Sequence, residues 1–238
     1  MIIVGHRGAR GEYPENTLQG FLYSQDIGLR HLEYDLRLSR DLEAFIHHDE
    51  SLLRTCGDDT IASTKTMEQL RQYEANRDQQ HNCPASIPSL RDVFEQCQKI
   101  ESTQLEVKSD YPDIIDHLVP QIITTVKACK QQQKVIITSF DRYVLDVAQR
   151  LDPTINRGFL CETEGVDAIA TAIELNCSWV IWHYPMLTAE QVQQAHEAGL
   201  RVSVFTVNKL DEMKRCEKLG VDSLITDYPS LALQHFLQ

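Results

Sequence analysis

The sequence of 238 residues predicts an α/β fold, a (β/α)8 TIM barrel with a small insertion after the second barrel strand. Short apolar runs rich in β-branched residues recur along the chain, and helical patterns lie between most of them. The length suits one barrel domain. The eight predicted strands are residues 2–4, 31–36, 104–107, 135–138, 157–160, 179–182, 202–207 and 224–226.

The predicted helices connect these strands and cover residues 16–27, 114–129, 143–150, 166–175, 189–198 and 210–219. Gly199 and Gly220 follow the last two of them, at the position where glycine commonly ends a helix. A doubly wound open sheet is the alternative fold, because periodicity alone does not show whether a parallel sheet closes.

One segment interrupts this alternation. Residues 39–103 separate the second strand from the next barrel strand, far more than the usual loop of about two to six residues. We expect a short strand at 43–47, a helix at 67–74, a loop at 78–88 and a helix from Ser89. We therefore predict a single domain, 1–238, with an inserted subdomain at about 50–88. A disordered linker between two domains is less consistent with the apolar residues of this segment, which include Ile46, Leu52, Leu53, Leu70 and Ile87.

Charge and cysteine content exclude several classes of protein. The formal net charge of −12 argues against a nucleic-acid-binding surface, which needs a basic face. The seven cysteines form no CxxC pair, so we expect reduced thiols in the cytoplasm, with a Cys56–Cys83 disulfide as the less favoured alternative. We expect no leader peptide and no stable membrane association, because no apolar run approaches the roughly 20 residues of a membrane span. No heptad pattern indicates an oligomeric state.

Acidic residues lie at the ends of two predicted strands. Glu33 and Asp35 are two positions apart, so both side chains face the same side of the sheet, and Glu106 and Lys108 repeat this spacing on the next barrel strand. Converging carboxylates favour one divalent cation, and an oxygen-only ligand set favours Mg²⁺ or Ca²⁺ over zinc, with Mn²⁺ also possible. A solvated rim, or a salt bridge to Arg37, is the alternative role for the acidic pair.

Two histidines occupy comparable positions. His6 ends the first strand and precedes Arg7 and Gly8, and arginine matches the oxygens of a phosphate with its planar fork. His48 follows an apolar run and precedes Asp49, whose carboxylate would orient the imidazole. Two such histidines can act as general acid and general base.

The order of these motifs resembles that of the glycerophosphodiester phosphodiesterase family, in its bacterial, cytoplasmic form. The resemblance covers essentially the whole chain and rests on His6-Arg7-Gly8, Pro14-Glu15-Asn16-Thr17, Glu33-x-Asp35, His48-Asp49-Glu50, Leu53-Arg54-Thr55, Ile87-Pro88-Ser89-Leu90, Leu105-Glu106-Val107-Lys108, Thr206-Val207-Asn208 and the segment 220–229. Two positions differ from the family pattern: Phe205 replaces the usual tryptophan before Thr-Val-Asn, and Asp41-Leu42-Glu43 replaces an Asp-Gly turn.

This resemblance implies metal-dependent hydrolysis of glycerophosphodiesters, small-molecule substrates, to sn-glycerol 3-phosphate and an alcohol. Glu33, Asp35 and Glu106 would bind the metal, and His6 and His48 would be the acid and base. Substrate-binding residues would be Arg7, Lys108, Glu15, Asn16 and Phe205. Asn16 or Thr17 could instead cap the first helix, and Trp182 or His183 could line the pocket rather than pack in the core.

The sequence leaves open whether water or the glycerol 2-hydroxyl attacks the phosphorus. It also leaves open which histidine acts first and which alcohol is preferred. Two other functions are possible: a lipid phosphodiesterase similar to the phospholipases D of spider venoms, and a catalytically silent barrel that binds phosphorylated ligands. The first would need a membrane-facing apolar surface, and the second would be indicated by a missing histidine or carboxylate.

Overall fold

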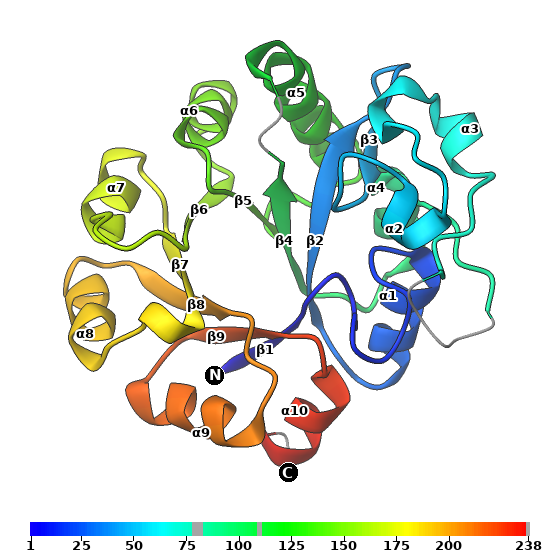
Figure 1. The fold of residues 1–238 in the computed structure, drawn as a ribbon. Helices are drawn as coiled ribbons and strands as arrows, with labels where there is room; N and C mark the ends of the chain where they lie inside the picture. The colour runs from blue at the N-terminus through cyan, green and yellow to red at the C-terminus, as the bar shows by residue number, and fades with distance from the viewer. Residues whose placement is uncertain (78–82, 109–110, 237–238) are drawn as a thin grey trace.

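The computed structural model describes residues 1–77, 83–108 and 111–236, and it shows a closed parallel barrel with helices outside it (Figure 1). Its eight parallel strands are β1 (Ile2–Gly5), β2 (His31–Leu38), β4 (Ser102–Val107), β5 (Val135–Ser139), β6 (Asn156–Cys161), β7 (Trp179–His183), β8 (Arg201–Phe205) and β9 (Ser223–Thr226). Because β1 pairs with both β9 and β2, the sheet closes. The (β/α)8 prediction is confirmed, and the open-sheet alternative is wrong.

Helices follow the barrel strands, and all but the last lie close to their predicted positions. They are α1 (Leu18–Asp26), α5 (Pro112–Ala128), α6 (Arg142–Leu151), α7 (Ala168–Glu174), α8 (Ala189–Glu197), α9 (Leu210–Leu219) and α10 (Pro229–Phe236), of which the pattern did not predict α10. Gly199 and Gly220 adopt positive φ angles of 78°, as expected for glycine at a helix end. No helix of the described residues is both long enough and apolar enough to cross a membrane.

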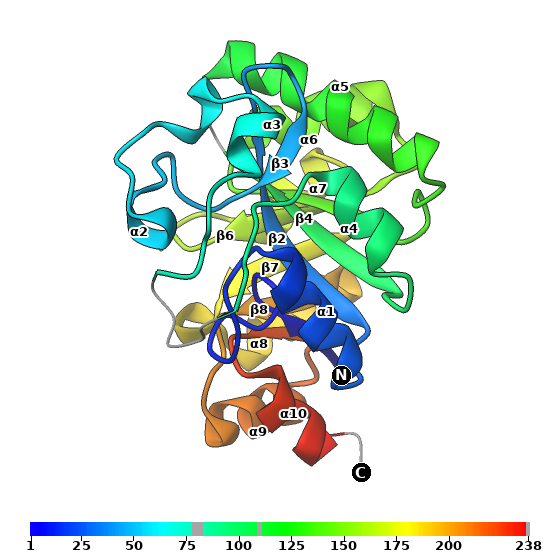
Figure 2. The same ribbon diagram turned by 90° about the vertical axis from the view of Figure 1, so that its right-hand side faces the viewer.

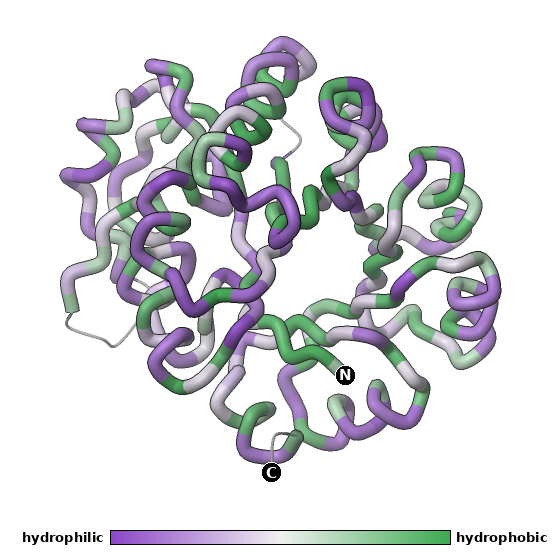
Figure 3. Tube along the Cα trace, turned by 180° about the vertical axis from the view of Figure 1, so that it is seen from behind, coloured by the Kyte–Doolittle hydropathy of each residue, from purple (hydrophilic) through white to green (hydrophobic). Residues whose placement is uncertain are grey.

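Strand alternation separates two apolar regions of the barrel. Side chains such as Leu32, Tyr34 and Leu36 of β2 point outward and are buried against the helices. A smaller cluster inside the barrel contains Val4, Ile136, Leu160, Trp179, Ile181 and Ile225. Figure 3 shows the corresponding distribution, with hydrophobic strands in the centre and hydrophilic residues on the outer turns of the helices. The inward-facing acids of β2 therefore lie on the barrel axis, as the spacing predicts.

The segment between β2 and β4 lies beside the barrel, next to α1 and β2 (Figures 1 and 2). It contains β3 (Ala44–Ile46), antiparallel to β2, then α2 (Leu53–Cys56), α3 (Met67–Leu70) and α4 (Leu90–Gln96). Its own apolar cluster is formed by Phe45, Leu52, Ala62, Met67, Leu70, Ala75 and Ile87. An insertion after the second barrel strand is thus present.

Local details of this segment differ from the sequence-based expectations. The helix predicted at 67–74 begins where expected, after the capping residue Thr66. It is only one turn long, because turns follow Leu70. Ser89 caps α4 by accepting a hydrogen bond from the Asp92 amide, so the helix begins where expected. Part of the predicted loop, residues 78–82, lies outside the described residues. Cys56 and Cys83 are both unpaired, so the disulfide alternative is wrong.

Candidate active site

The proposed site residues lie at the carboxyl ends of the barrel strands. His6 and Arg7 directly follow β1, Glu33 and Asp35 belong to β2, and Glu106 belongs to β4. Asp35 and Glu106 are register partners in neighbouring strands. The carboxyl end of a parallel barrel is the face where side chains from different strands meet, and it is the face that carries active sites in this fold.

Three carboxylates form a compact cluster at this end. One oxygen each of Glu33, Asp35 and Glu106 lies within 4.8 Å of the other two. Glu33 Oε1 is buried and has no hydrogen-bond partner among the described residues. Burial, followed by the charges of Asp35 and Glu106, raises the pKa of Glu33 well above its usual value. A divalent cation fits this donor set, because it would satisfy the orphaned oxygen and offset the repulsion between the acids.

Two basic side chains balance part of this negative charge. Lys108 Nζ lies 2.8 Å from Asp35 Oδ1 and also donates to Glu106 Oε1. Arg7 Nε lies 3.3 Å from Asp35 Oδ2, and the Arg7 backbone amide donates to Glu33 Oε2 at 3.0 Å. Burial alone would raise the pKa of Asp35, but Lys108 and Arg7 hold it well below its usual value. Lys108 and Arg7 therefore favour the ionised form of Asp35.

His6 is oriented by an acidic residue that follows β9, the strand that pairs with β1 and closes the barrel. Its Nδ1 atom lies 2.6 Å from Oδ1 of Asp227, which directly follows β9. Asn208 holds that carboxylate by donating from Nδ2 to Asp227 Oδ2 at 2.8 Å. Burial lowers the pKa of His6, and the hydrogen bond to Asp227 opposes this effect. The second ring nitrogen, Nε2, lies 3.9 Å from Glu33 Oε2 and so faces the carboxylate cluster.

His48 has a similar carboxylate partner, supplied by its neighbour. Its Nδ1 atom lies 2.6 Å from Asp49 Oδ1, and Arg54 of α2 donates from Nε to Asp49 Oδ2 at 2.6 Å. Arg37 holds the backbone carbonyl of His48 through Nε and Nη2. Burial lowers the pKa of His48 to about 4, and the charge of Asp35 opposes that shift. Both imidazoles are therefore held through Nδ1 by a carboxylate.

Glu15 and Asn16 support the site rather than begin the first helix. Thr17 caps α1 by accepting from the Gly20 amide, whereas Asn16 Nδ2 donates to Asp35 Oδ2 at 2.7 Å. Glu15 accepts from Arg7 at 2.9 Å and from Arg54 at 2.7 Å. Of the two capping candidates, Thr17 is therefore the residue that caps α1, and the contacts of Glu15 and Asn16 connect the insertion to the acids of β2.

A cavity of about 390 Å³ lies directly above the carboxylate cluster. It is lined by His6, Arg7, Arg10, His48, Glu106, Val107, Lys108, Phe140, Glu162, His183, Phe205 and Thr206. Phe205 packs edge-on against Phe140, with ring centroids 5.9 Å apart. The cavity has the size of a small-molecule site with a few charged groups at one end.

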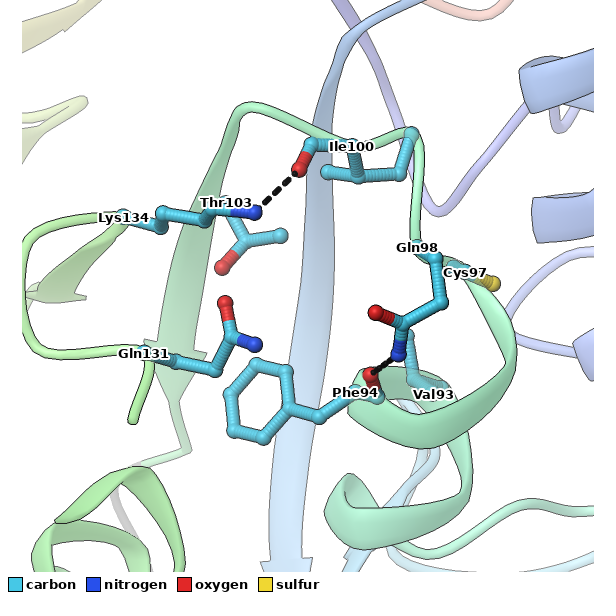
Figure 4. A pocket seen from close by; sticks show the side chains of 8 residues that line it. All are labelled: Val93, Phe94, Cys97, Gln98, Ile100, Thr103, Gln131 and Lys134. Carbon is cyan, nitrogen blue, oxygen red and sulfur yellow. Dashed lines mark hydrogen bonds between the residues drawn. The ribbon is translucent and has the colours of Figure 1, made fainter. Parts of the chain in front are cut away.

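A second cavity, drawn in Figure 4, lies among α4, β4 and the segment that follows α5. Its volume is about 20 Å³, which has room for roughly one water molecule. The polar side chains around it are used in local contacts: Lys134 Nζ donates to the Ile100 carbonyl, and Gln98 Nε2 donates to the Phe94 carbonyl. This cavity is too small for an organic ligand.

Comparison with known proteins gives the same assignment as the motifs. The model of the glycerophosphoryl diester phosphodiesterase family matches residues 6–231. The chain belongs to this family. A protein from Caldanaerobacter subterraneus, named glycerophosphodiester phosphodiesterase, is 28% identical over 233 residues, covering 96% of this chain and 94% of the relative. A protein of the same name from Bacillus altitudinis is 28% identical over 244 residues, covering 98% and 96% of the two chains.

A solved structure extends the similarity to three dimensions. The phosphodiesterase of Oleispira antarctica, determined in complex with the product sn-glycerol-3-phosphate, superposes on this chain with a TM-score of 0.93. The two are 25% identical, and the match covers 100% of this chain and 97% of the other. Resemblance to the glycerophosphoryl diester phosphodiesterase family, first indicated by motifs, is thereby confirmed.

The structure of this family member also shows supporting residues to which the sequence analysis gave no role. Asp227 and Arg54 both fall within family motifs, but only the three-dimensional contacts show that Asp227 holds His6 and that Arg54 binds both Glu15 and Asp49. Of the two aromatic candidates on β7, His183 lines the cavity, whereas Trp182 is fully buried between the barrel and the helices. Strand alternation separates these two neighbours, because successive side chains point to opposite faces.

Proposed function

We propose that this chain hydrolyses glycerophosphodiesters to sn-glycerol 3-phosphate and an alcohol, and that the reaction requires a divalent cation. The observation that carries the proposal is that two carboxylate-paired histidines, Arg7, Lys108 and Glu106 border one cavity, and that Glu106 belongs to the cluster of three carboxylates. Family membership and the product bound to the Oleispira antarctica relative support the choice of substrate.

Glu33, Asp35 and Glu106 would hold the cation, with Mg²⁺, Ca²⁺ and Mn²⁺ as the ions suited to oxygen ligands. When bound, the cation supplies Lewis-acid activation of a phosphate oxygen and charge neutralisation. Arg7 and Lys108 border the same cavity, so their donors stabilise the negative charge that develops on the phosphorus oxygens. Their contacts to Asp35 place both cations at the site before substrate arrives.

His6 and His48 divide the proton transfers. With Nδ1 held by Asp227 or Asp49, each ring presents Nε2 to the cavity. One histidine starts neutral and takes up at Nε2 the proton of the attacking hydroxyl, which belongs to water or to the glycerol 2-position. The other starts as the imidazolium and gives its Nε2 proton to the leaving alcohol oxygen. Glu15, Asn16 and Phe205 position these groups and the substrate.

We also propose the cell compartment and the binding partner of the enzyme. The unpaired cysteines fit a reducing compartment, so we place the protein in the cytoplasm. Its partner is a small-molecule diester, and the net charge of −12 does not suit a nucleic acid.

Release of sn-glycerol 3-phosphate from glycerophosphocholine, glycerophosphoethanolamine and glycerophosphoglycerol tests the function. Assays would contain Mg²⁺, Ca²⁺, Mn²⁺ or EDTA. We expect release with at least one metal and its loss in EDTA. Folded protein that releases no product with any metal would contradict the proposal and favour a silent, ligand-binding barrel.

A further inference from the structure

The cavity above the carboxylate cluster has two chemically different halves. One half comes from β4 and the residues after β1, β3 and β4, which supply His6, Arg7, Arg10, His48, Glu106 and Lys108. The opposite half comes from four consecutive strands: Phe140 directly follows β5, Glu162 directly follows β6, His183 ends β7, and Phe205 ends β8. In Figure 1 these four strands run along the side of the barrel opposite β2. The proposed chemistry uses the first half and leaves the second without a role beyond the wall formed by Phe205.

Three aromatic rings form the wall of this second half. The rings of Phe140 and Phe205 meet edge to face, with centroids 5.9 Å apart and an interplanar angle of 80°. The His183 ring lies 5.7 Å from Phe205, tilted by 42°. All three side chains are only partly buried, so the cavity reaches their surfaces. Faces of aromatic rings attract cations, and they attract weakly hydrated ammonium groups in particular.

One acidic side chain lies in the same half. Glu162 is exposed, lines the cavity, and forms no hydrogen bond or ion pair with any residue that the structure describes. The basic residues of the cavity, Arg7, Arg10 and Lys108, come from the other half. The cavity therefore runs from a positive, phosphate-binding end to an aromatic end with a negative charge, which complements a ligand whose charges are arranged in the opposite order.

We propose that Glu162, with Phe140, His183 and Phe205, selects diesters whose leaving alcohol carries a positively charged amino group, quaternary or primary. The inference rests on the proposed function for its place in the reaction. In such a zwitterionic diester the phosphate lies at Arg7 and Lys108, and the ammonium group lies against the rings and Glu162. Glu162 is thus a specificity-determining residue that discriminates between head groups by their charge.

The direct test measures binding of choline and of 3,3-dimethylbutan-1-ol, its uncharged isostere, by ligand-observed NMR titration of the full-length protein. The two probes share size and shape, so the ratio of their affinities reports charge recognition alone. We expect the native protein to prefer choline, and Glu162→Gln to reduce the ratio about fivefold. Glu164→Gln, in the same exposed loop but outside the cavity lining, is the matched control and should leave the ratio unchanged. An equal affinity for both probes, or a ratio unaffected by Glu162→Gln, would overturn the inference.

Turnover separates this inference from the proposed function. The ratio of kcat/KM for glycerophosphocholine over glycerophosphoglycerol should fall about fivefold in Glu162→Gln and should not change in Glu164→Gln. Phe205→Leu, which keeps an apolar wall but removes the ring, should lower the same ratio. Charge-selective binding in a protein that hydrolyses no diester would contradict the proposed reaction but support the cation site. Hydrolysis with an unchanged ratio would support the reaction and contradict the assignment of Glu162.

Discussion

Lys108 Nζ lies 2.8 Å from Asp35 Oδ1, inside the cluster of acids that would hold the metal. The same ammonium group donates to Glu106, and the two carboxylates in turn raise the pKa of Lys108 against the opposing effect of burial. Lys108 therefore offsets the repulsion between Asp35 and Glu106 when no metal is bound. Its second proposed role, phosphate binding, requires the same positive charge at the same place.

Lys108→Gln should destabilise the metal-free protein by about 3 kcal/mol, because two buried acids lose their cation. Since a divalent cation restores the balance of charge, Mg²⁺ should raise the melting temperature of this variant more than that of the native protein. Calorimetric melting with and without Mg²⁺ measures both effects. Lys214→Gln, on the exposed face of α9, is the control. An equal response of both variants to Mg²⁺ would show that Lys108 does not compensate the cluster.

Glu33→Gln should lose metal binding and activity together. The substitution keeps the shape of the side chain but removes the charge of the one cluster member that has an orphaned buried oxygen. Titration calorimetry with Mn²⁺ and the product-release assay measure the two properties. Retained metal affinity together with lost turnover would place Glu33 among the proton-transfer residues instead.

His48→Ala should keep metal binding and lose turnover by about a factor of 100 or more. The imidazole is held by Asp49 rather than by the three clustered acids, so its removal leaves the ligand set intact. Titration calorimetry with Mn²⁺ and the product-release assay measure metal binding and turnover. A calorimetric trace without metal binding would show that His48 is a ligand and that its proposed role is wrong.

Asp227→Asn should lower kcat with little change in melting temperature. The carboxylate fixes the orientation of His6 through Nδ1, and an amide in its place holds the ring less strongly and removes the neighbouring negative charge. Steady-state kinetics should show at least a tenfold loss in kcat, while the exposed Asp211→Asn control retains native kinetics. A native kcat in Asp227→Asn would show that the reaction does not depend on the contact between Asp227 and His6.

Stability at low pH should depend on Glu15. Burial opposes ionisation, but hydrogen bonds and charges from Arg54 and Arg7 lower the pKa of Glu15 from 4.5 to about 2. Because the folded-state pKa is the lower one, ionised Glu15 stabilises the fold above about pH 4.5, and this contribution disappears as the pH falls toward 2. It amounts to about 3 kcal/mol. Urea unfolding at neutral pH and near pH 3 should therefore show a smaller pH-dependent loss in Glu15→Gln than in the exposed control Glu68→Gln. Equal losses in the two variants would contradict this role.

The sequence predicted the barrel and the clustering of its three acids because both depend on local patterns. Alternation along β2 and β4 was sufficient to place Glu33, Asp35 and Glu106 on one side, and their convergence follows from parallel pairing. The pairing of His6 with Asp227 was not predictable in this way, because it joins residues 221 positions apart through closure of the sheet. The short helix α2 was missed because it is a single turn of four residues, too short to show a helical period, and Leu52 at its start makes no side-chain capping hydrogen bond.

The most direct test of the account is an anomalous difference map from crystals of the native protein soaked in Mn²⁺. We expect one strong peak surrounded by Glu33, Asp35 and Glu106, and its absence in crystals of Glu33→Gln treated in the same way. A peak at other residues, or no peak in crystals of a protein that remains active in EDTA, would contradict the claim that these carboxylates form the metal site of a phosphodiesterase.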